Sequence, residues 1–203
     1  EAIERIKSYE FFSKYFLKAI QLQDLMAISR WDSSSNKIIY DKKLYNSKSR
    51  KWTNKEVIPS TQEAYKTYRE IMSASQNDKS RFILISIKHQ SPNLAKEWTG
   101  KIIQLTNESM RDADKNKSLK SLEFLNNEAS KVSYEHLRKA VSFLQQEQMK
   151  SLMLVEANEE YVFKIINSPI APELKYGPKR LMLIIASAFF GFVFGVMYVL
   201  IEK

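Results

Sequence analysis

The residue types that most often catalyse reactions are few in this chain of 203 residues, and their spacing does not favour chemistry. The two histidines, His89 and His136, are not at metal-ligand spacing, and the absence of cysteine excludes thiolate ligands, disulfides and cysteine nucleophiles. Carboxylate pairs such as Asp112 and Asp114 stand among lysines, as they do on solvated helix faces. The four glycines match no nucleotide-binding pattern. We therefore predict no catalytic residue, no metal site, no cofactor and no enzymatic activity.

A second candidate for chemistry is the basic segment of residues 37–55. It holds seven basic side chains and one acidic side chain, a net charge of +6, whereas residues 1–36 and 56–174 are each neutral. A nucleic-acid-binding protein typically spreads its basic residues along a docking face, so we predict no nucleic-acid partner. Aromatic rings stack on sugars and lysines attract acidic groups, which favours contact with a saccharide; a solvated loop or a rim between subunits is the alternative. The candidate contact residues are Lys42, Lys43, Tyr45, Lys48, Lys51 and Trp52.

The C-terminal residues 181–201 form an uninterrupted run of 21 residues without charge, proline, asparagine or glutamine. A helix of this length covers roughly 32 Å, enough to cross the hydrocarbon core of a bilayer. Lys179 and Arg180 precede the run and would lie at the lipid headgroups. We therefore predict a transmembrane helix, with the lipid bilayer as a partner.

Small residues recur within this apolar run. Gly191 and Gly195 form a GxxxG pattern, and Ser187 extends the same face by one turn. Small residues at this spacing let a second helix approach closely, which matters where lipid supplies no hydrophobic driving force. We predict that these three residues pack against another transmembrane helix, of the same subunit or of a neighbour.

Two regions before residue 76 have the sequence pattern of helices. The N-terminal periodicity is helical with a break around Ser8–Phe11. Ser60 followed by Glu63 is typical of a capping box and predicts a helix that runs to about Ser75.

Three segments indicate extended structure. Arg81–His89 and Tyr161–Ile166 are rich in β-branched and aromatic residues and predict two strands that pair with each other. Residues 37–53 alternate apolar residues with lysines, which indicates either a hairpin or a poorly ordered excursion.

A very long helix is predicted between the two strands. Ser91 and Pro92 are typical of a helix start, and no further proline occurs before Val155. An unbroken helix of about 63 residues would be on the order of 95 Å long. It must protrude from a domain of this size, or break near 112–118 or 126–127.

The second half of this helix carries a narrow apolar stripe on a charged surface. Leu122, Leu137 and Leu144 belong to it. Such a stripe suits contact with a neighbouring helix better than burial in a globular core. We predict that these leucines line an interface between identical subunits.

Together these elements predict an α+β fold in three parts. Residues 1–168 form a small membrane-proximal α/β base with a long protruding helix over about 92–155. Residues 169–180 form a proline-spaced connector, and residues 181–201 form the transmembrane helix.

Several features follow one another in a fixed order from Ser60 to Lys203. A strand leads into SPNLAKEW (91–98) and a long helix, and EEYVFKII (159–166) follows. A connector then leads into the apolar span; it carries Pro169, Pro172, Pro178, Lys179 and Arg180. This order resembles the bacterial polysaccharide co-polymerases, the chain-length determinant proteins of lipopolysaccharide O-antigen, and the connector is its most specific element.

The resemblance implies a function and an assembly. Members of that family have two transmembrane helices around a large periplasmic domain, form homo-oligomeric rings and set the modal length of a polysaccharide that a separate membrane polymerase builds. It implies a non-enzymatic scaffold in the bacterial inner membrane with residues 1–180 mostly periplasmic, near a growing polysaccharide. The first span of the family is not in this chain, and we interpret it as missing sequence before Glu1.

Charge near the span favours the opposite orientation. Lys175, Lys179 and Arg180 precede it, and the positive-inside tendency would place residues 1–180 in the cytoplasm. Two alternatives follow. One is a tail-anchored helical tether in the cytoplasm, and the other is a periplasmic adaptor of a capsule or exopolysaccharide tyrosine kinase.

Overall fold

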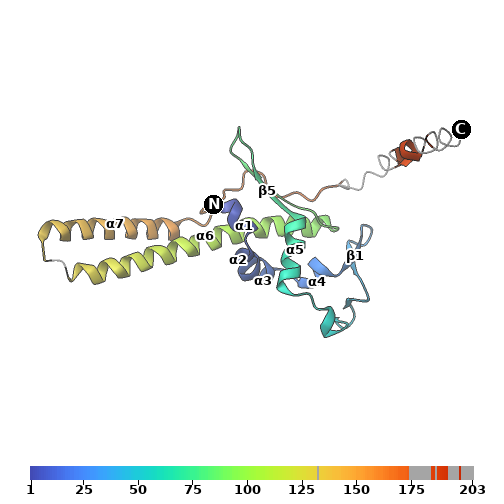
Figure 1. Cartoon of the computed structure of the whole chain (residues 1–203), viewed down its shortest axis with the longest axis horizontal. Helices are drawn as coiled ribbons and strands as arrows, with labels where there is room; N and C mark the ends of the chain where they lie inside the picture. The colour runs from blue at the N-terminus through green and yellow to red at the C-terminus, as the bar shows by residue number, and fades with distance from the viewer. Residues whose placement is uncertain (132, 174–183, 186, 192–196, 198–203) are drawn as a thin grey trace. The chain divides into compact units, whose positions relative to one another are not determined.

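The computed structural model describes residues 1–131, 133–173, 184–185, 187–191 and 197 (Figure 1). The chain divides into two units, residues 1–171 and residues 172–203. In its described residues the first unit is mixed α+β, as predicted. Its strands form small two-stranded antiparallel sheets, and helices make up most of the rest.

Short helices form the N-terminal part of the first unit. Ser8 separates the first two, because its hydroxyl accepts a hydrogen bond from Phe11 N–H (3.1 Å) and donates one to Arg5 O (2.8 Å). The break predicted around Ser8–Phe11 is therefore confirmed. The elements are α1 (Ala2–Lys7), α2 (Tyr9–Phe11), the π-helix η1 (Phe12–Phe16), α3 (Leu17–Ala19) and α4 (Leu22–Met26).

Two small hairpins follow α4. Strand β1 (Ile28–Asp32) pairs with β2 (Lys37–Tyr40), and β3 (Tyr45–Asn46) pairs with β4 (Lys51–Trp52). A short 3₁₀ helix, η2 (Lys55–Val57), ends this region. Of the two structures predicted for residues 37–53, the chain adopts the hairpin.

The predicted capping box begins α5 (Thr61–Ile71). The Ser60 hydroxyl accepts from Glu63 N–H (3.2 Å), and the Glu63 carboxylate accepts from Ser60 N–H (2.8 Å). The predicted end near Ser75 is wrong, because the chain becomes extended as β5 (Met72–Gln76). This strand buries Met72 and Ala74, and only an extended chain places alternate residues on one face.

The predicted strand within 81–89 is confirmed as β6 (Ile83–Ile87), but its partner is β5. Tyr161–Ile166 does not form the predicted second strand. The physical reason is a competing partner: the side chain of Asn107 binds the backbone of Val162 and Phe163, so a strand ladder does not claim these groups.

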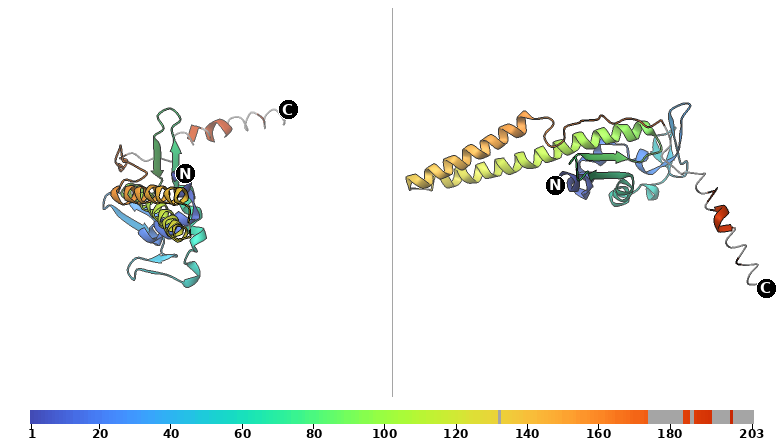
Figure 2. Two further views of the ribbon diagram at one scale, coloured as in Figure 1. Left: turned by 90° about the vertical axis from the view of Figure 1, so that its left-hand side faces the viewer. Right: turned by 90° about the horizontal axis from the view of Figure 1, so that it is seen from above.

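The segment predicted as one helix of about 63 residues is two helices. Helix α6 (Pro92–Ala129) begins at the predicted cap, Ser91, whose hydroxyl accepts from Leu94 N–H (3.4 Å). Helix α7 (Glu135–Ala157) then runs back along the second half of α6, as Figure 2 shows. The unbroken helix over 92–155 is therefore wrong, and there is no break at 112–118; the chain breaks two residues beyond the other predicted point, 126–127.

The break after α6 involves no proline or glycine. Instead, the Ser130 hydroxyl donates to Asn127 O (2.8 Å), a local bond that competes with continuation of the helix. Folding back as two helices allows side chains to be buried. Val155 of α7 is fully buried, and Ser118 of α6 is 3% exposed.

The hydrophobic core lies where the first half of α6 crosses the N-terminal helices and α5. Trp98 is 1% exposed, and its ring meets Phe16 edge-on at 5.8 Å. Phe16 in turn packs on Tyr68 at 4.9 Å between ring centroids. Aromatic side chains bury large areas, so this cluster fixes the base from which the helical hairpin extends.

No helix among the described residues has the length and apolar character needed to cross a membrane. The predicted span, residues 181–201, lies largely outside the described residues. Pro178, Lys179, Arg180 and Gly195 also lie outside them.

Candidate interaction surfaces

The helical hairpin of α6 and α7 presents many large apolar side chains to solvent. We call the following set the hairpin surface: Leu119, Phe124, Leu137, Phe143, Leu144, Met149, Met153 and Leu154, each between 43% and 65% exposed. Large apolar side chains exposed in such number on one element often mark an interaction site. We therefore treat this surface as the first candidate functional site.

The three leucines predicted for an oligomer face occupy different positions on the hairpin. Leu137 and Leu144 lie two turns apart on α7 and are 46% and 48% exposed. Leu122 is half-buried on α6. A shallow groove of about 400 Å³ beside Leu144 includes Phe124 and Leu125 of α6. Thus Leu137 and Leu144 are accessible to a partner, and Leu122 is only partly accessible.

Polar contacts hold the two helices of the hairpin together. Asn126 accepts a hydrogen bond from Gln145 (2.7 Å), and the Ser118 hydroxyl donates to that of Ser151 (3.3 Å). Lys115 forms an ion pair with Glu156, and the hydrogen bond from this lysine lowers the pKa of the glutamate. The hairpin is thus a defined pair of helices.

The basic segment, residues 37–55, is the second candidate, and we call it the basic hairpin. Its seven basic side chains are all exposed. Tyr45 is only 6% exposed, because it packs between Tyr40 (5.1 Å) and Trp52 (5.7 Å). Tyr45 therefore forms the interior of this hairpin, and the half-buried Trp52 is the aromatic residue that reaches its surface. The predicted contact residues Lys42, Lys43, Lys48 and Lys51 all lie at that surface.

An open groove of about 860 Å³ runs beside β6. Its walls are the β5–β6 hairpin and residues 162–169, and Thr99 and Ile103 of α6 also line it. The exposed Leu84 of β6, at 69%, lies along this groove. Polar and apolar residues line the groove in similar numbers, and Pro169 is the one residue among them that was predicted as a site residue from sequence.

Asn107 of α6 fixes one wall of this groove. It is 6% exposed, its Oδ1 accepts from Val162 N–H (3.0 Å) and Phe163 N–H (2.7 Å), and its Nδ2 donates to Phe163 O (2.9 Å). Asn107 thereby attaches the chain after α7 to the base. Sequence reasoning missed this residue, since nothing in its local pattern indicates a partner 55 positions away.

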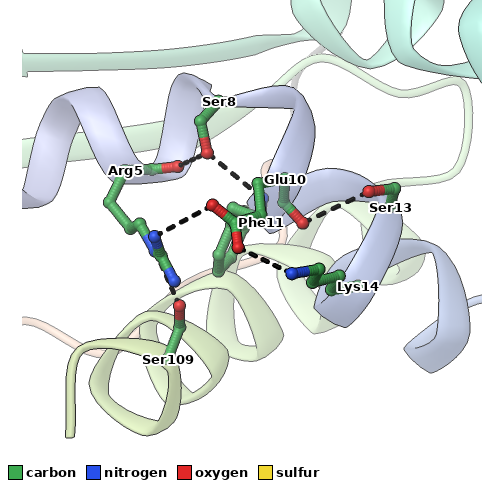
Figure 3. A network of polar contacts seen from close by, with 7 residues as sticks. All are labelled: Arg5, Ser8, Glu10, Phe11, Ser13, Lys14 and Ser109. Carbon is green, nitrogen blue, oxygen red and sulfur yellow. Dashed lines mark hydrogen bonds and ion pairs between the residues drawn. The ribbon is translucent and has the colours of Figure 1, made fainter. Parts of the chain in front are cut away.

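A second long-range contact ties the N-terminal helices to α6. Figure 3 shows Arg5, whose Nε donates to the Ser109 hydroxyl (2.8 Å) and whose guanidinium pairs with Glu10 (3.4 Å). The hydrogen bond from Lys14 (2.8 Å), followed by the charges of Lys14 and Arg5, lowers the pKa of Glu10. These residues hold the base together, and no groove beside them offers space for a substrate among the described pockets.

The histidines have structural surroundings. His89 packs against Trp98 at 4.8 Å, its Nδ1 accepts from Ser91 N–H (3.0 Å), and its Nε2 lies 3.0 Å from Asp24 O. These contacts use both ring nitrogens. His136 is exposed near the start of α7.

The carboxylates that are close in sequence do not act as pairs in the structure. Asp114 accepts a hydrogen bond from the Tyr161 hydroxyl (2.9 Å), which links α6 to the segment after α7. Glu159 and Glu160 are exposed. None of these carboxylates faces another across a pocket described here.

Part of the predicted C-terminal packing face is described. The Ser187 hydroxyl donates a hydrogen bond to Ile184 O (2.9 Å), as serines do within helices. A Cβ atom added to Gly191 would meet no heavy atom of the described chain within 4 Å. Pro169 is half-buried and Pro172 is exposed.

The sequence matches no protein-family model and no curated protein.

Proposed function

We propose that this chain is a membrane-anchored scaffold that assembles into a homo-oligomeric ring in the bacterial inner membrane. Residues 1–180 lie mostly in the periplasm, and the assembly sets the chain length of O-antigen or a related surface polysaccharide made by a separate membrane polymerase. The observation that carries this proposal is the hairpin surface, a set of exposed apolar residues on two helices that extend from a well-packed base.

The proposed mechanism requires no chemistry on this chain. Hairpin surfaces of neighbouring copies pack against each other, and the apolar run 181–201 with Gly191 and Gly195 anchors each copy beside the polymerase. Polymer length then follows from the geometry of the ring and from how long the polymer and polymerase stay in contact with it. The order of sequence elements described above supports this function over other oligomeric scaffolds.

The proposal is tested by removing apolar contact from the hairpin surface alone. In the variant Leu137→Ser with Leu144→Ser, we expect a smaller oligomer in mild detergent and a shorter or broader polysaccharide length distribution in producing cells. Both side chains are about half-exposed, so the fold itself should change little.

A matched control places the same change on the base. Phe82→Ser with Leu84→Ser alters apolar residues that are 60% and 69% exposed, outside the hairpin surface. We expect normal oligomer size and normal polymer length for this control. An unchanged oligomer in the hairpin variant, or equal losses in both variants, would contradict the proposal.

The cytoplasmic tether is the second candidate, and one observation favours it: Lys175, Lys179 and Arg180 precede the apolar run. In that function the hairpin surface binds helices of a different protein. The tether predicts that the hairpin variant loses a heterologous partner while polysaccharide length stays normal.

A further inference from the structure

We propose that the basic hairpin, residues 37–55, binds an acidic polysaccharide. The inference rests on the proposed function for its choice of ligand, since a saccharide is the polymer that the scaffold would meet. It goes further by assigning the ligand class to one surface, and by requiring negative charge on the sugar chain.

The first argument is charge without compensation. The basic hairpin carries seven exposed basic side chains against Asp41, and none of the seven forms an ion pair with any residue that the structure describes. Elsewhere in the described chain lysines are often paired within helices, as Lys14 is with Glu10 (2.8 Å) and Lys101 with Glu97 (2.7 Å). Net charge gathered on one small element attracts a ligand of opposite charge.

The second argument is that the backbone carrying these charges is ordered by its own contacts. The Asn46 side chain accepts from Lys48 N–H (3.0 Å) and Ser49 N–H (3.2 Å), which fixes the turn between β3 and β4. Thr53 N–H donates to Leu44 O (3.0 Å), and Tyr45 fills the interior. A preformed surface loses less entropy when a ligand binds.

The third argument is the chemistry beside the charges. A shallow open groove of about 650 Å³ lies along β4, where Trp52 is half-buried. An indole ring stacks on a pyranose ring. Amide and hydroxyl groups bind the hydroxyls of the sugar, and cations bind its carboxylates. The residues that line the groove are Arg50, Lys51, Trp52, Thr53, Asn54, Lys55 and Ile58.

An anionic lipid surface is the competing ligand for such charge. The residues between β3 and β4 are Ser47, Lys48, Ser49 and Arg50, all exposed and none apolar. A segment that enters a membrane interface needs apolar side chains at its leading edge. The polar turn therefore favours a hydrated polymer over a bilayer.

The test measures binding of the full chain, held in neutral detergent, to polygalacturonate as an acidic polysaccharide and to dextran as a neutral one. In about 0.01 M salt, where charges act over about 30 Å, we expect polygalacturonate to bind and dextran not to bind. Binding should weaken strongly at about 0.15 M salt. In the variant Lys42→Gln, Lys43→Gln, Lys48→Gln and Lys51→Gln, affinity should fall by about tenfold or more, as expected for the loss of four exposed ion pairs.

A control variant removes equal charge from other surfaces. Lys66→Gln, Lys96→Gln, Lys117→Gln and Lys150→Gln also lowers the formal net charge of +9 by four and changes only exposed residues. We expect it to lose clearly less affinity than the basic-hairpin variant, since these four charges act on the ligand only through the long-range field and not through direct ion pairs.

Three results would overturn the inference: no binding of polygalacturonate, equal losses in the two variants, or binding to phosphatidylglycerol vesicles that depends on the same four lysines while polygalacturonate does not compete. Because these measurements need no polymerase, their failure leaves the scaffold proposal standing. Conversely, normal polysaccharide length in the hairpin-surface variant would contradict the scaffold proposal but would not change the measured binding of polygalacturonate.

Discussion

The carboxylate of Asp32 organises the turn between β1 and β2. It accepts hydrogen bonds from the Ser35 hydroxyl (2.7 Å), the Ser34 hydroxyl (2.7 Å) and Ser34 N–H (3.0 Å). These bonds favour the ionised form, with the Ser35 hydroxyl contributing most, and they lower the pKa of Asp32 from 3.8 to about 2. The turn is thus stabilised by a charge that persists well into acid.

This pKa predicts how the turn responds to pH. A depressed pKa in the folded state means that the stabilisation is fully present above pH 3.8 and is lost as pH falls through about 2. We predict that Ser35→Ala raises the pKa of Asp32 toward its ordinary value. The measurement is an NMR titration of the Asp32 carboxyl carbon.

The neighbouring serine provides the control for this prediction. Ser33 is exposed and makes no hydrogen bond to Asp32, so Ser33→Ala should leave the titration unchanged. A pKa near 3.8 in the parent, or the same pKa in parent and Ser35→Ala, would show that the serine hydroxyls do not hold this turn.

Among the elements, α6 determines most of the architecture, because it serves both the base and the hairpin. Its first half carries the core residue Trp98, and its second half pairs with α7. Asn107 lies between these parts and binds the chain that returns from α7. Contacts of this one helix therefore set the position of residues 162–163 relative to β6.

Removing the Asn107 side chain should release that segment. In Asn107→Ala, two N–H groups and one carbonyl lose their partners, and we predict a fall of about 2 kcal/mol in the free energy of unfolding by urea. Amide hydrogen exchange at Val162 and Phe163 should become faster. Asn107→Asp keeps the acceptor for both N–H groups but sets a carboxylate oxygen against Phe163 O, so it should destabilise the chain as well.

Asn116 offers the matched comparison on the same helix. It is exposed, and Asn116→Ala should change the free energy of unfolding by less than about 0.5 kcal/mol. Equal stability and equal exchange in the Asn107 and Asn116 variants would mean that the side-chain bonds of Asn107 do not position the returning chain.

These elements also indicate what could be derived from sequence. The caps at Ser60 and Ser91 were predictable because each signal is complete within three residues. The strand β6 was predictable from its β-branched residues, but its partner was not. Strand pairing depends on which groups bind the backbone of each segment. The side chain of Asn107 binds the backbone of Val162 and Phe163, so β6 pairs with β5 instead.

The turn after α6 was predicted only as one of several alternatives, for a related reason. No proline or glycine marks it, and the stripe of apolar residues is compatible with either one long helix or two that fold back. Burial of Val155 becomes visible only in three dimensions. The surface residues Leu137 and Leu144 were found from the stripe, whereas Tyr45 was misassigned because an aromatic residue among lysines gives no sign of burial.

On the scale of the whole molecule, two features have to act in one compartment. In the proposed scaffold the hairpin surface packs against identical neighbours, and the basic hairpin binds an acidic polymer. The periplasm beside a polysaccharide polymerase would offer both, whereas the charges before residue 181 favour the cytoplasm. The orientation of residues 1–180 therefore decides between the scaffold and the tether.

The absence of cysteine makes this orientation measurable with a single substitution. Ser49 is exposed in the turn between β3 and β4, and Ser49→Cys should react with a membrane-impermeant maleimide in intact spheroplasts if residues 1–180 are periplasmic. Ser109→Cys is the matched control, because Ser109 is fully buried and its thiol should react only after denaturation. Labelling of Ser49→Cys that requires lysis would place the base and the hairpin in the cytoplasm. The polymer would then be on the other side of the membrane, and the hairpin surface would have to bind a cytoplasmic partner instead.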